Sequence, residues 1–152
     1  MRKLKPAMYT GLLHTHSSLR YLVLLLLLAV IFKSLTGFTG KKPFEKLDDK
    51  LSLFLLIFTH IQLVVGLILY FVSPFVQFGA QTMSDKATRY WTVEHIFGML
   101  IAVVLITIAR ATSKRMTDPV AKHKRLFIFN LIALIIIVAM IVLIPMRNAW
   151  AV

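Results

Sequence analysis

Cysteine is absent from this chain of 152 residues, and acidic side chains are scarce. Without thiols the protein can form no disulfide, iron–sulfur cluster, thiolate metal site or cysteine nucleophile, although this absence says nothing about its compartment. Only 6 Asp and Glu residues stand against 18 Lys and Arg, which gives a formal charge of +12. In a soluble domain that charge would suggest nucleic acid as a partner. No nucleic-acid-binding motif accompanies it, so no nucleic-acid partner is expected.

Apolar residues make up 59% of the chain, and the mean hydropathy is +0.81, far above the usual balance of a globular protein. Four apolar runs lie between charged or turn-forming segments, and a soluble fold could not bury them all. The pattern predicts an all-α integral membrane protein, built as an up-down-up-down four-helix bundle in a single transmembrane domain, 1–152. The expected helices span about 9–35, 50–72, 90–111 and 124–145.

The first apolar run follows three basic residues, which is also the pattern of a signal peptide. Polar residues 14–20 interrupt the place where an apolar signal core would begin, and no small-residue cleavage site follows Phe32. A membrane helix is therefore the better interpretation. Its wholly apolar part, 21–32, rises only ~18 Å against a hydrocarbon core of ~30 Å, so residues 14–20 are expected inside the bilayer.

Basic residues are concentrated in the connections after the first and third predicted helices, around 33–50 and 110–125. These two connections belong to the same face of an up-down-up-down bundle. The positive-inside rule places that face in the cytoplasm and therefore predicts that both termini lie outside. The turn-like stretch 36–40 is expected to end the first helix.

Ionisable groups inside a bilayer are costly unless they are paired or ligated, so they mark candidate functional sites. The intramembrane candidates are His14, His16, Arg20, His60, Glu94 and His95. His123 lies within a run of basic residues, and we expect it to contact solvent or lipid headgroups.

His16 and His95 are expected about 8 Å outward of the midpoints of their helices, and therefore at one level. The first and third helices are diagonal neighbours in the bundle, so the two imidazoles can face each other across the interior. A membrane cytochrome holds haem iron in this way, with one imidazole from each of two helices. The spacing thus predicts a haem b site with His16 and His95 as axial ligands.

Residues near this pair suit the same arrangement. Gly98 follows His95 by three positions, and its missing side chain would leave space for a porphyrin edge. Arg20 follows His16 by four positions and can pair with a haem propionate, with Glu94 as a competing partner. His14 lies about 200° around the helix from His16, so it cannot also point inward.

Other assignments stay open at this point. His60, near the centre of the second helix, is an alternative ligand partnered by His95, or a group that binds quinone or relays protons. A bare metal ion is a further alternative, because nitrogen and oxygen donors suit iron, copper or zinc. Its possible ligands are His14, His16, His60, Glu94 and His95.

The His14-Thr15-His16 segment with Arg20, followed by His60 and by Glu94-His95, resembles small bacterial cytochrome b-type membrane proteins of the cytochrome b561-like class. The resemblance covers the four-helix core as a pattern. It implies one haem b near the outer face, because the fourth predicted helix contains no histidine. It also implies a bacterial inner membrane location.

The sequence thus predicts a haem-b electron-transfer protein in contact with membrane lipid, and a subunit or partner of a quinone-linked respiratory system. No catalytic residue is assigned. The alternative is an accessory subunit without a cofactor that packs against a larger membrane complex. A metal-binding membrane protein that uses the same His and Glu residues is the third hypothesis.

Overall fold

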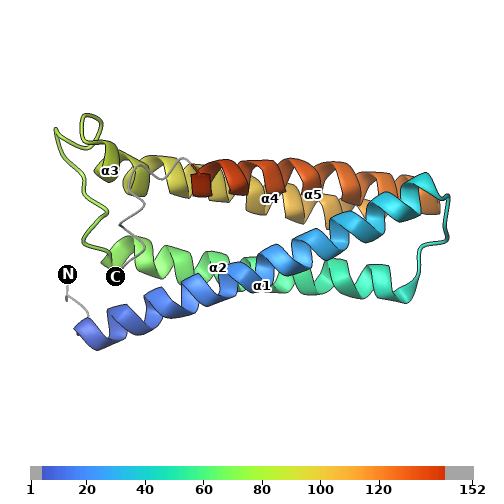
Figure 1. Ribbon diagram of the computed structural model, residues 1–152, viewed down its shortest axis with the longest axis horizontal. Helices are drawn as coiled ribbons and strands as arrows, with labels where there is room; N and C mark the ends of the chain where they lie inside the picture. Colours follow the sequence, from blue (N-terminus) through green and yellow to red (C-terminus); the bar gives the residue numbers. More distant parts are fainter. Residues whose placement is uncertain (1–4, 143–152) are drawn as a thin grey trace.

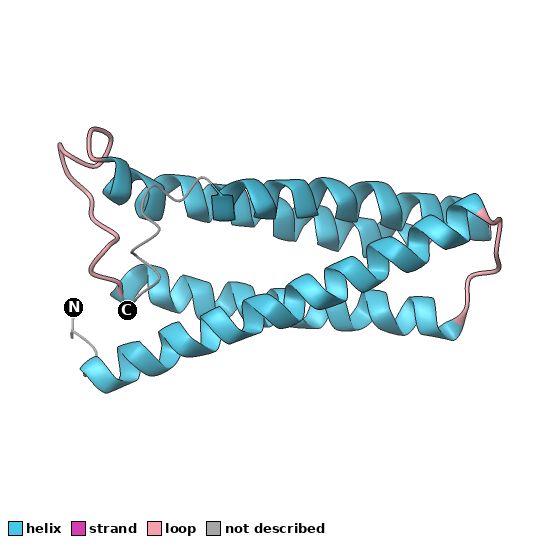
Figure 2. Cartoon of the chain, viewed as in Figure 1, coloured by secondary structure: helices cyan, strands magenta, loops and turns pink. Residues whose placement is uncertain are grey.

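The computed structural model describes residues 5–142. Over that range the chain forms helices and loops without a strand, and four helical spans are long and apolar enough to cross a membrane (Figures 1 and 2). The first two are α1 (Pro6–Thr39) and α2 (Lys46–Val72). The third, Lys86–Ser113, joins α3 (Lys86–Arg89), the π-helical turn η1 (Tyr90–Glu94) and α4 (His95–Ser113). The fourth is α5 (Pro119–Val142). The prediction of an all-α four-helix membrane bundle is confirmed.

Local sequence explains where the helices begin. Proline opens both α1 and α5, where its missing N–H group is not needed. The α5 start is also capped, because Asp118 Oδ2 accepts a hydrogen bond of 2.8 Å from the Ala121 N–H. This helix therefore begins five residues before the predicted position 124. Its predicted end near 145 lies outside the described residues.

The predicted turn at 36–40 is wrong, because α1 continues to Thr39. Gly37, which suggested the turn, is a buried residue within the helix. A Cβ atom at this position would overlap the ring of His123 on α5. The glycine thus allows two helices to approach closely rather than ending one of them.

The four spans surround a narrow apolar core. α1 packs against α2 and α5, and α4 packs against α5 and α2, so α1 and α4 are diagonal as expected. Leu27, Leu55, Ala102, Ile106 and Ala133 belong to the central cluster. Large apolar side chains also cover the outward faces, including Tyr21, Phe32, Phe71 and Phe97. This outer surface suits contact with the hydrocarbon of a bilayer.

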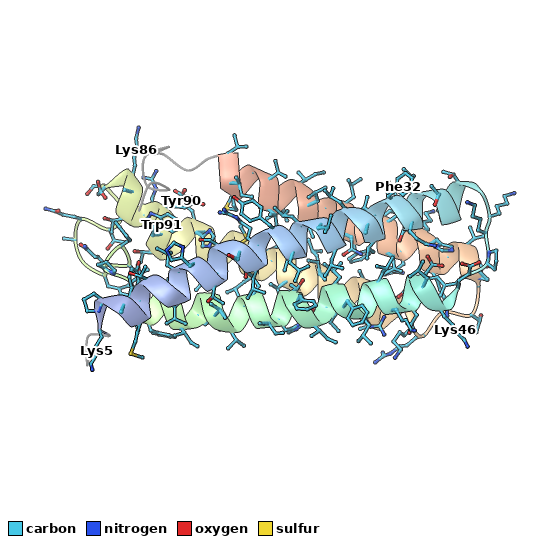
Figure 3. All side chains as sticks on the ribbon, turned by 60° about the horizontal axis from the view of Figure 1, so that its bottom comes forward. Lys5, Phe32, Lys46, Lys86, Tyr90 and Trp91 are labelled. Atoms are coloured by element: carbon cyan, nitrogen blue, oxygen red, sulfur yellow. The ribbon has the colours of Figure 1, made fainter. Side chains whose placement is uncertain are left out.

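The connections α1–α2 and α4–α5 lie at one end of the bundle, and the connection between α2 and α3 lies at the other (Figure 1). The two basic connections therefore share an end, as predicted. We call it the basic end. Lys46 lies there, whereas Lys86, Tyr90 and Trp91 lie at the opposite end (Figure 3).

His123 differs from its prediction. Its side chain lies at the basic end but is only 2% exposed, and its Nε2–H group donates to the Pro43 carbonyl at 3.2 Å. The ring packs on Gly37, and its centroid lies 5.2 Å from that of Phe44. The neighbouring lysines suggested a solvated position, but the interior-facing side of α5 begins within this basic run.

Candidate functional site

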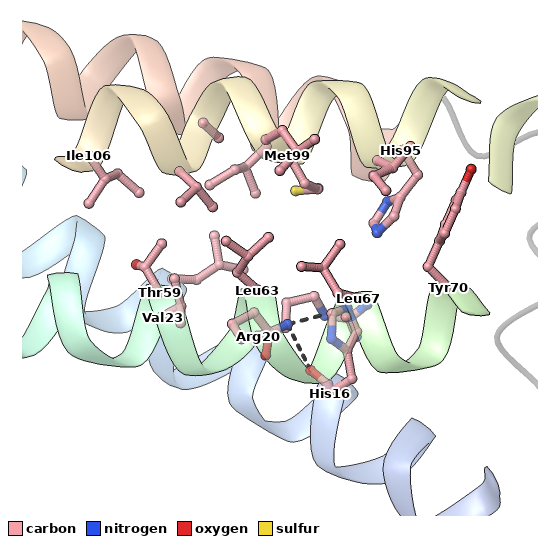
Figure 4. A pocket seen from close by; sticks show the side chains of 18 of the residues that line it. His16, Arg20, Val23, Thr59, Leu63, Leu67, Tyr70, His95, Met99 and Ile106 are labelled. Atoms are coloured by element: carbon pink, nitrogen blue, oxygen red, sulfur yellow. Dashed lines mark hydrogen bonds between the residues drawn. The ribbon is translucent and has the colours of Figure 1, made fainter. Parts of the chain in front are cut away.

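A cavity lies between α2 and α4, and residues of α1 and α5 complete its wall (Figure 4). The space open to water-sized molecules is about 120 Å³. Most of the wall is apolar, with Leu63, Leu67 and Met99 among its residues. The polar exceptions lie mainly toward one end of the bundle. We call this space the histidine cavity and define it by His16, Arg20, Thr59, Gln62, Tyr70 and His95.

His16 and His95 come from the diagonal helices α1 and α4 and meet in this cavity. Their ring centroids are 6.5 Å apart, and the ring planes are inclined by 69°. The expectation that these two imidazoles share a level and face each other is confirmed. It succeeded because the helices are regular between the residues that were used to estimate their midpoints.

His16 is held from α2. The Gln62 Nε2–H group donates to the His16 backbone carbonyl at 3.0 Å, and the same Nε2 lies 3.4 Å from His16 Nε2. Gly66, one turn further along α2, leaves room for the ring, since a Cβ atom there would lie 3.0 Å from His16 Cε1. Sequence reasoning assigned no role to Gln62 or Gly66. Thr59, Gln62 and Gly66 are spaced for one helical face, which was the available signal.

His95 is held by Tyr90. The Tyr90 hydroxyl donates to the Met140 carbonyl on α5 at 2.8 Å. Its oxygen lies 3.4 Å from His95 Nδ1 and can accept the proton of that nitrogen. His95 Nε2 is then the nitrogen that carries a lone pair. Tyr90 was missed by sequence reasoning, which treated it only as the start of a helix.

The turn that positions these two residues is π-helical. The His95 N–H group donates to the Tyr90 carbonyl five residues back, so η1 holds one residue more than an α-helical turn. The extra residue changes the direction in which Tyr90 points relative to His95 and the rest of α4. π-Helical turns occur often at functional sites. No pattern in side-chain polarity marks such an insertion, so it was not predicted.

Arg20 lines the cavity one turn along α1 from His16. Its guanidinium donates to the Tyr21 hydroxyl at 3.0 Å and lies 4.8 Å from the centre of that ring. The predicted competitor Glu94 accepts instead from Arg89, at 2.7 Å. A cation therefore lies beside the two imidazoles, and the acidic residue nearest to His95 in sequence is already paired.

Three buried polar atoms in this cavity have no hydrogen-bond partner within residues 5–142. They are His16 Nδ1, Thr59 Oγ1 and Gln62 Oε1. Buried polar atoms in native proteins are nearly always hydrogen-bonded to protein, water or a ligand. The cavity is thus chemically incomplete as protein alone, which points to occupancy by another molecule.

The remaining candidates lie elsewhere. His14 is exposed on α1, and His60 is exposed on α2 with its Nδ1–H group donating to Leu56 O at 2.8 Å. Neither lines the cavity. Gly98 faces α5, where a Cβ atom would lie 2.6 Å from Met140 Sδ. The space expected beside Gly98 for a porphyrin edge is therefore filled by Met140.

The spacing of the two rings fits two-imidazole ligation of one metal centre. Metal–nitrogen bonds of roughly 2 Å, with each ring centre about 1 Å behind its nitrogen, give a centroid separation near 6 Å. The observed value is 6.5 Å. The open space is smaller than the ~300 Å³ at the lower end of ligand pockets. A porphyrin would therefore displace side chains, of which Met99 is the most adaptable.

A bare metal ion fits less well. Over the part of the chain that is described, no three His, Cys, Asp or Glu side chains come together to hold one. His14 and His60 are exposed and lie outside the cavity, and Glu94 is paired with Arg89, so none of them joins His16 and His95.

The chain was compared with protein-family models, with curated proteins and with solved structures, and none of them matches.

Proposed function

We propose that this protein binds haem b between His16 and His95 and transfers electrons in a bacterial inner membrane. We further propose that it is a subunit or partner of a quinone-linked respiratory system, with both termini outside the cytoplasm. The observation that carries the haem proposal is the facing of two imidazoles from diagonal helices at 6.5 Å inside an apolar cavity. The histidine pattern of the sequence agrees with the haem proposal, and the basic end, which suits the cytoplasmic side, supports the proposed position of the termini.

Haem iron supplies one-electron chemistry when bound, and the protein controls its potential through ligands, hydrogen bonds and burial. Tyr90 can accept from His95 Nδ1, and Nε2 would then be the nitrogen that holds the iron. Gln62 anchors α2 to the backbone at His16 and limits rotation of that ring. Arg20 lines the cavity, and its guanidinium would attract the propionates of a bound haem. Apolar residues around the site exclude water.

The test is the absorption spectrum of the purified protein after expression with a haem supply. A reduced b-type spectrum at one haem per chain is expected. His16→Ala and His95→Ala should each abolish it, whereas His14→Ala and His60→Ala are matched controls that should retain it, because both side chains are exposed. Imidazole added to the two cavity variants should restore part of the spectrum. A colourless wild-type protein that is fully folded would refute the proposal.

Arg20 provides a second test of the same site. Arg20→Leu should insert into the membrane as well as the parent but retain haem poorly or shift its reduction potential, because an anionic group loses a charge-assisted donor. Arg20→Lys should recover only part of the effect, since an ammonium cannot form the bidentate pair. Unchanged occupancy and potential in Arg20→Leu would leave headgroup contact as the role of this residue.

An accessory subunit without a cofactor is the second candidate. The broad apolar and aromatic outer surface favours it, since partner helices could pack there as readily as lipid. Copurification of a colourless protein with a fixed set of membrane proteins would support this function. It would also reject the haem proposal.

A further inference from the structure

A second hollow lies at the basic end, far from the histidine cavity. It is an open cleft of about 450 Å³ between the end of α1, the α1–α2 connection, the start of α2 and His123 of α5. Its wall includes Lys33, Lys42, Glu45, Asp48 and His123. Phe32, on the adjoining surface of α1, is 67% exposed. We call this hollow the basic-end cleft.

Two deeply buried side chains in this cleft each have an acceptor atom that receives no hydrogen bond from the described residues. His123 is 2% exposed and Asp48 is 6% exposed. Because a carbonyl can only accept, the His123 contact to Pro43 O requires the proton on Nε2, and the neutral ring then presents Nδ1 as an acceptor. His123 Nδ1 finds no hydrogen-bond donor anywhere between residues 5 and 142.

Asp48 also has a buried acceptor atom of this kind. Its Oδ2 accepts from the Glu45 N–H at 2.9 Å and caps α2. Its Oδ1 lies 3.3 Å from Lys33 Nζ as an ion pair, but within the described residues it accepts no hydrogen bond. Two buried acceptors in one cleft call for a ligand with several N–H donors.

Charges around the cleft define the rest of the ligand. Lys42 is exposed at the wall and Lys33 adjoins Asp48, so the cleft also contains positively charged side chains near the acceptor atoms of His123 and Asp48. The cleft lies where a membrane-crossing helix meets the aqueous boundary, and the exposed ring of Phe32 continues from it along the apolar surface. A ligand that matches this pattern carries a primary ammonium, an adjacent anionic phosphate and an apolar tail.

We propose that the basic-end cleft binds the headgroup of an aminophospholipid such as phosphatidylethanolamine. The ammonium donates to His123 Nδ1 and Asp48 Oδ1, the phosphate lies against Lys42, and the acyl chains run along Phe32. The site is independent of haem, because rise along α1 from His16 to Gly37 separates the two regions by roughly 30 Å.

Ligand chemistry gives the sharpest test. Native mass spectrometry of the protein in detergent should be titrated with phosphatidylethanolamine, its N-methyl and N,N-dimethyl forms, phosphatidylcholine and phosphatidylglycerol. Affinity should fall with each methyl group, by roughly tenfold over the series, because each removes an N–H donor. Phosphatidylglycerol should bind as weakly as phosphatidylcholine. Equal affinity for all headgroups, or strongest binding of phosphatidylglycerol, would overturn the proposal.

Protein variants check the location. Lys42→Gln should weaken binding of phosphatidylethanolamine by roughly two- to fivefold, the scale of an exposed ion pair. Lys50→Gln is the matched control, because Lys50 is an exposed lysine at the same end but outside the cleft wall. Soluble glycerophosphoethanolamine should compete with the lipid, whereas equimolar inorganic phosphate should not. Equal losses in both variants, or competition by phosphate alone, would reject headgroup recognition at this cleft.

Discussion

The two ends of the bundle each hold histidine side chains that face the interior, but in opposite surroundings. At the basic end, His123 packs on Gly37 and Phe44 and donates to a backbone carbonyl. At the other end, His16 and His95 face each other across an open cavity. The His123 ring is enclosed by protein, whereas His16 and His95 each have one ring nitrogen near a protein partner and line a cavity.

This difference shows that the burial of a histidine and its suitability as a metal ligand are separate properties. His123 is the most deeply buried of these histidines, yet no second imidazole faces it in the described part of the chain. His16 and His95 are less enclosed but converge from diagonal helices. For identifying a two-imidazole site, convergence is therefore the more useful property.

Replacement of His123 offers the largest contrast between the ends. His123→Ala should lower the free energy of unfolding by about 2 to 5 kcal/mol, because it opens a cavity beside Gly37. Haem binding per folded molecule should be unchanged, whereas His16→Ala should abolish it. Denaturant titration in micelles, combined with the haem spectrum of the folded fraction, separates the two effects. Loss of haem from folded His123→Ala would show that the ends are coupled.

Glycine substitutions in α1 sharpen the comparison. Gly37→Ala should destabilise the protein by about 1 to 3 kcal/mol, because its Cβ atom would overlap the His123 ring. Gly11→Ala is the matched control in the same helix, since no neighbouring atom lies within 4 Å of its Cβ position. That substitution should stabilise the helix by about 0.5 to 1 kcal/mol. Thermal unfolding of both variants would give shifts of opposite sign, and equal shifts would contradict the packing described.

Tyr90→Phe tests how the histidine cavity is organised. Loss of the hydroxyl should lower the free energy of unfolding by about 0.5 to 1.5 kcal/mol and free His95 Nδ1. Tyr70→Phe is the control, because Tyr70 also donates to a backbone carbonyl, that of Thr92, at 2.7 Å. Nitrogen-15 spectra of His95 without haem should show a changed tautomer only in Tyr90→Phe. A change in both variants would remove the specific role of Tyr90.

The smallest effect is expected at Asp85, in the connection before α3. The Thr88 side chain, and then its backbone N–H at 2.8 Å, donate hydrogen bonds that lower the pKa of Asp85. Because the pKa is lower when folded, this cap stabilises α3 above the ordinary Asp pKa and is lost as pH falls through the lowered value. Thr88 amide exchange should therefore quicken in acid beyond the intrinsic rate. Asp85→Asn should remove that pH dependence, since asparagine caps at any pH.

Much of the fold follows from the length of the apolar runs alone. A chain that crosses a bilayer must satisfy its backbone hydrogen bonds internally, and long helices are one of the few structures that do so. The shared depth of His16 and His95 could be predicted from the rise per residue of a helix, because this rise is uniform along most of both helices. His60 could not be excluded by depth, because its position around α2 is set by the neighbours of that helix. Only the spacing of Thr59, Gln62 and Gly66 indicated which face of α2 turns inward.

Other features depend on contacts between distant segments. Gly37 is a turn signal by its residue type, but its close packing with His123 depends on a helix more than eighty residues away. The π-helical turn at Tyr90–Glu94 is likewise stabilised by the contact between Tyr90 and Met140 on α5. Single-sequence patterns describe local periodicity and therefore cannot supply either of these partners.

The length of α1 has a mechanical consequence. Its 34 residues measure ~51 Å, well beyond a hydrocarbon thickness of ~30 Å, and it crosses the bundle obliquely (Figure 1). A helix that exceeds the bilayer adjusts its tilt to the lipid around it. His16 lies on this helix, and His95 lies on α4, which is inclined differently. A change in bilayer thickness should therefore change the distance between the two histidines. Lipid chain length thereby becomes a physical control on the geometry between the two imidazoles, measurable by spin labels on α1 and α4.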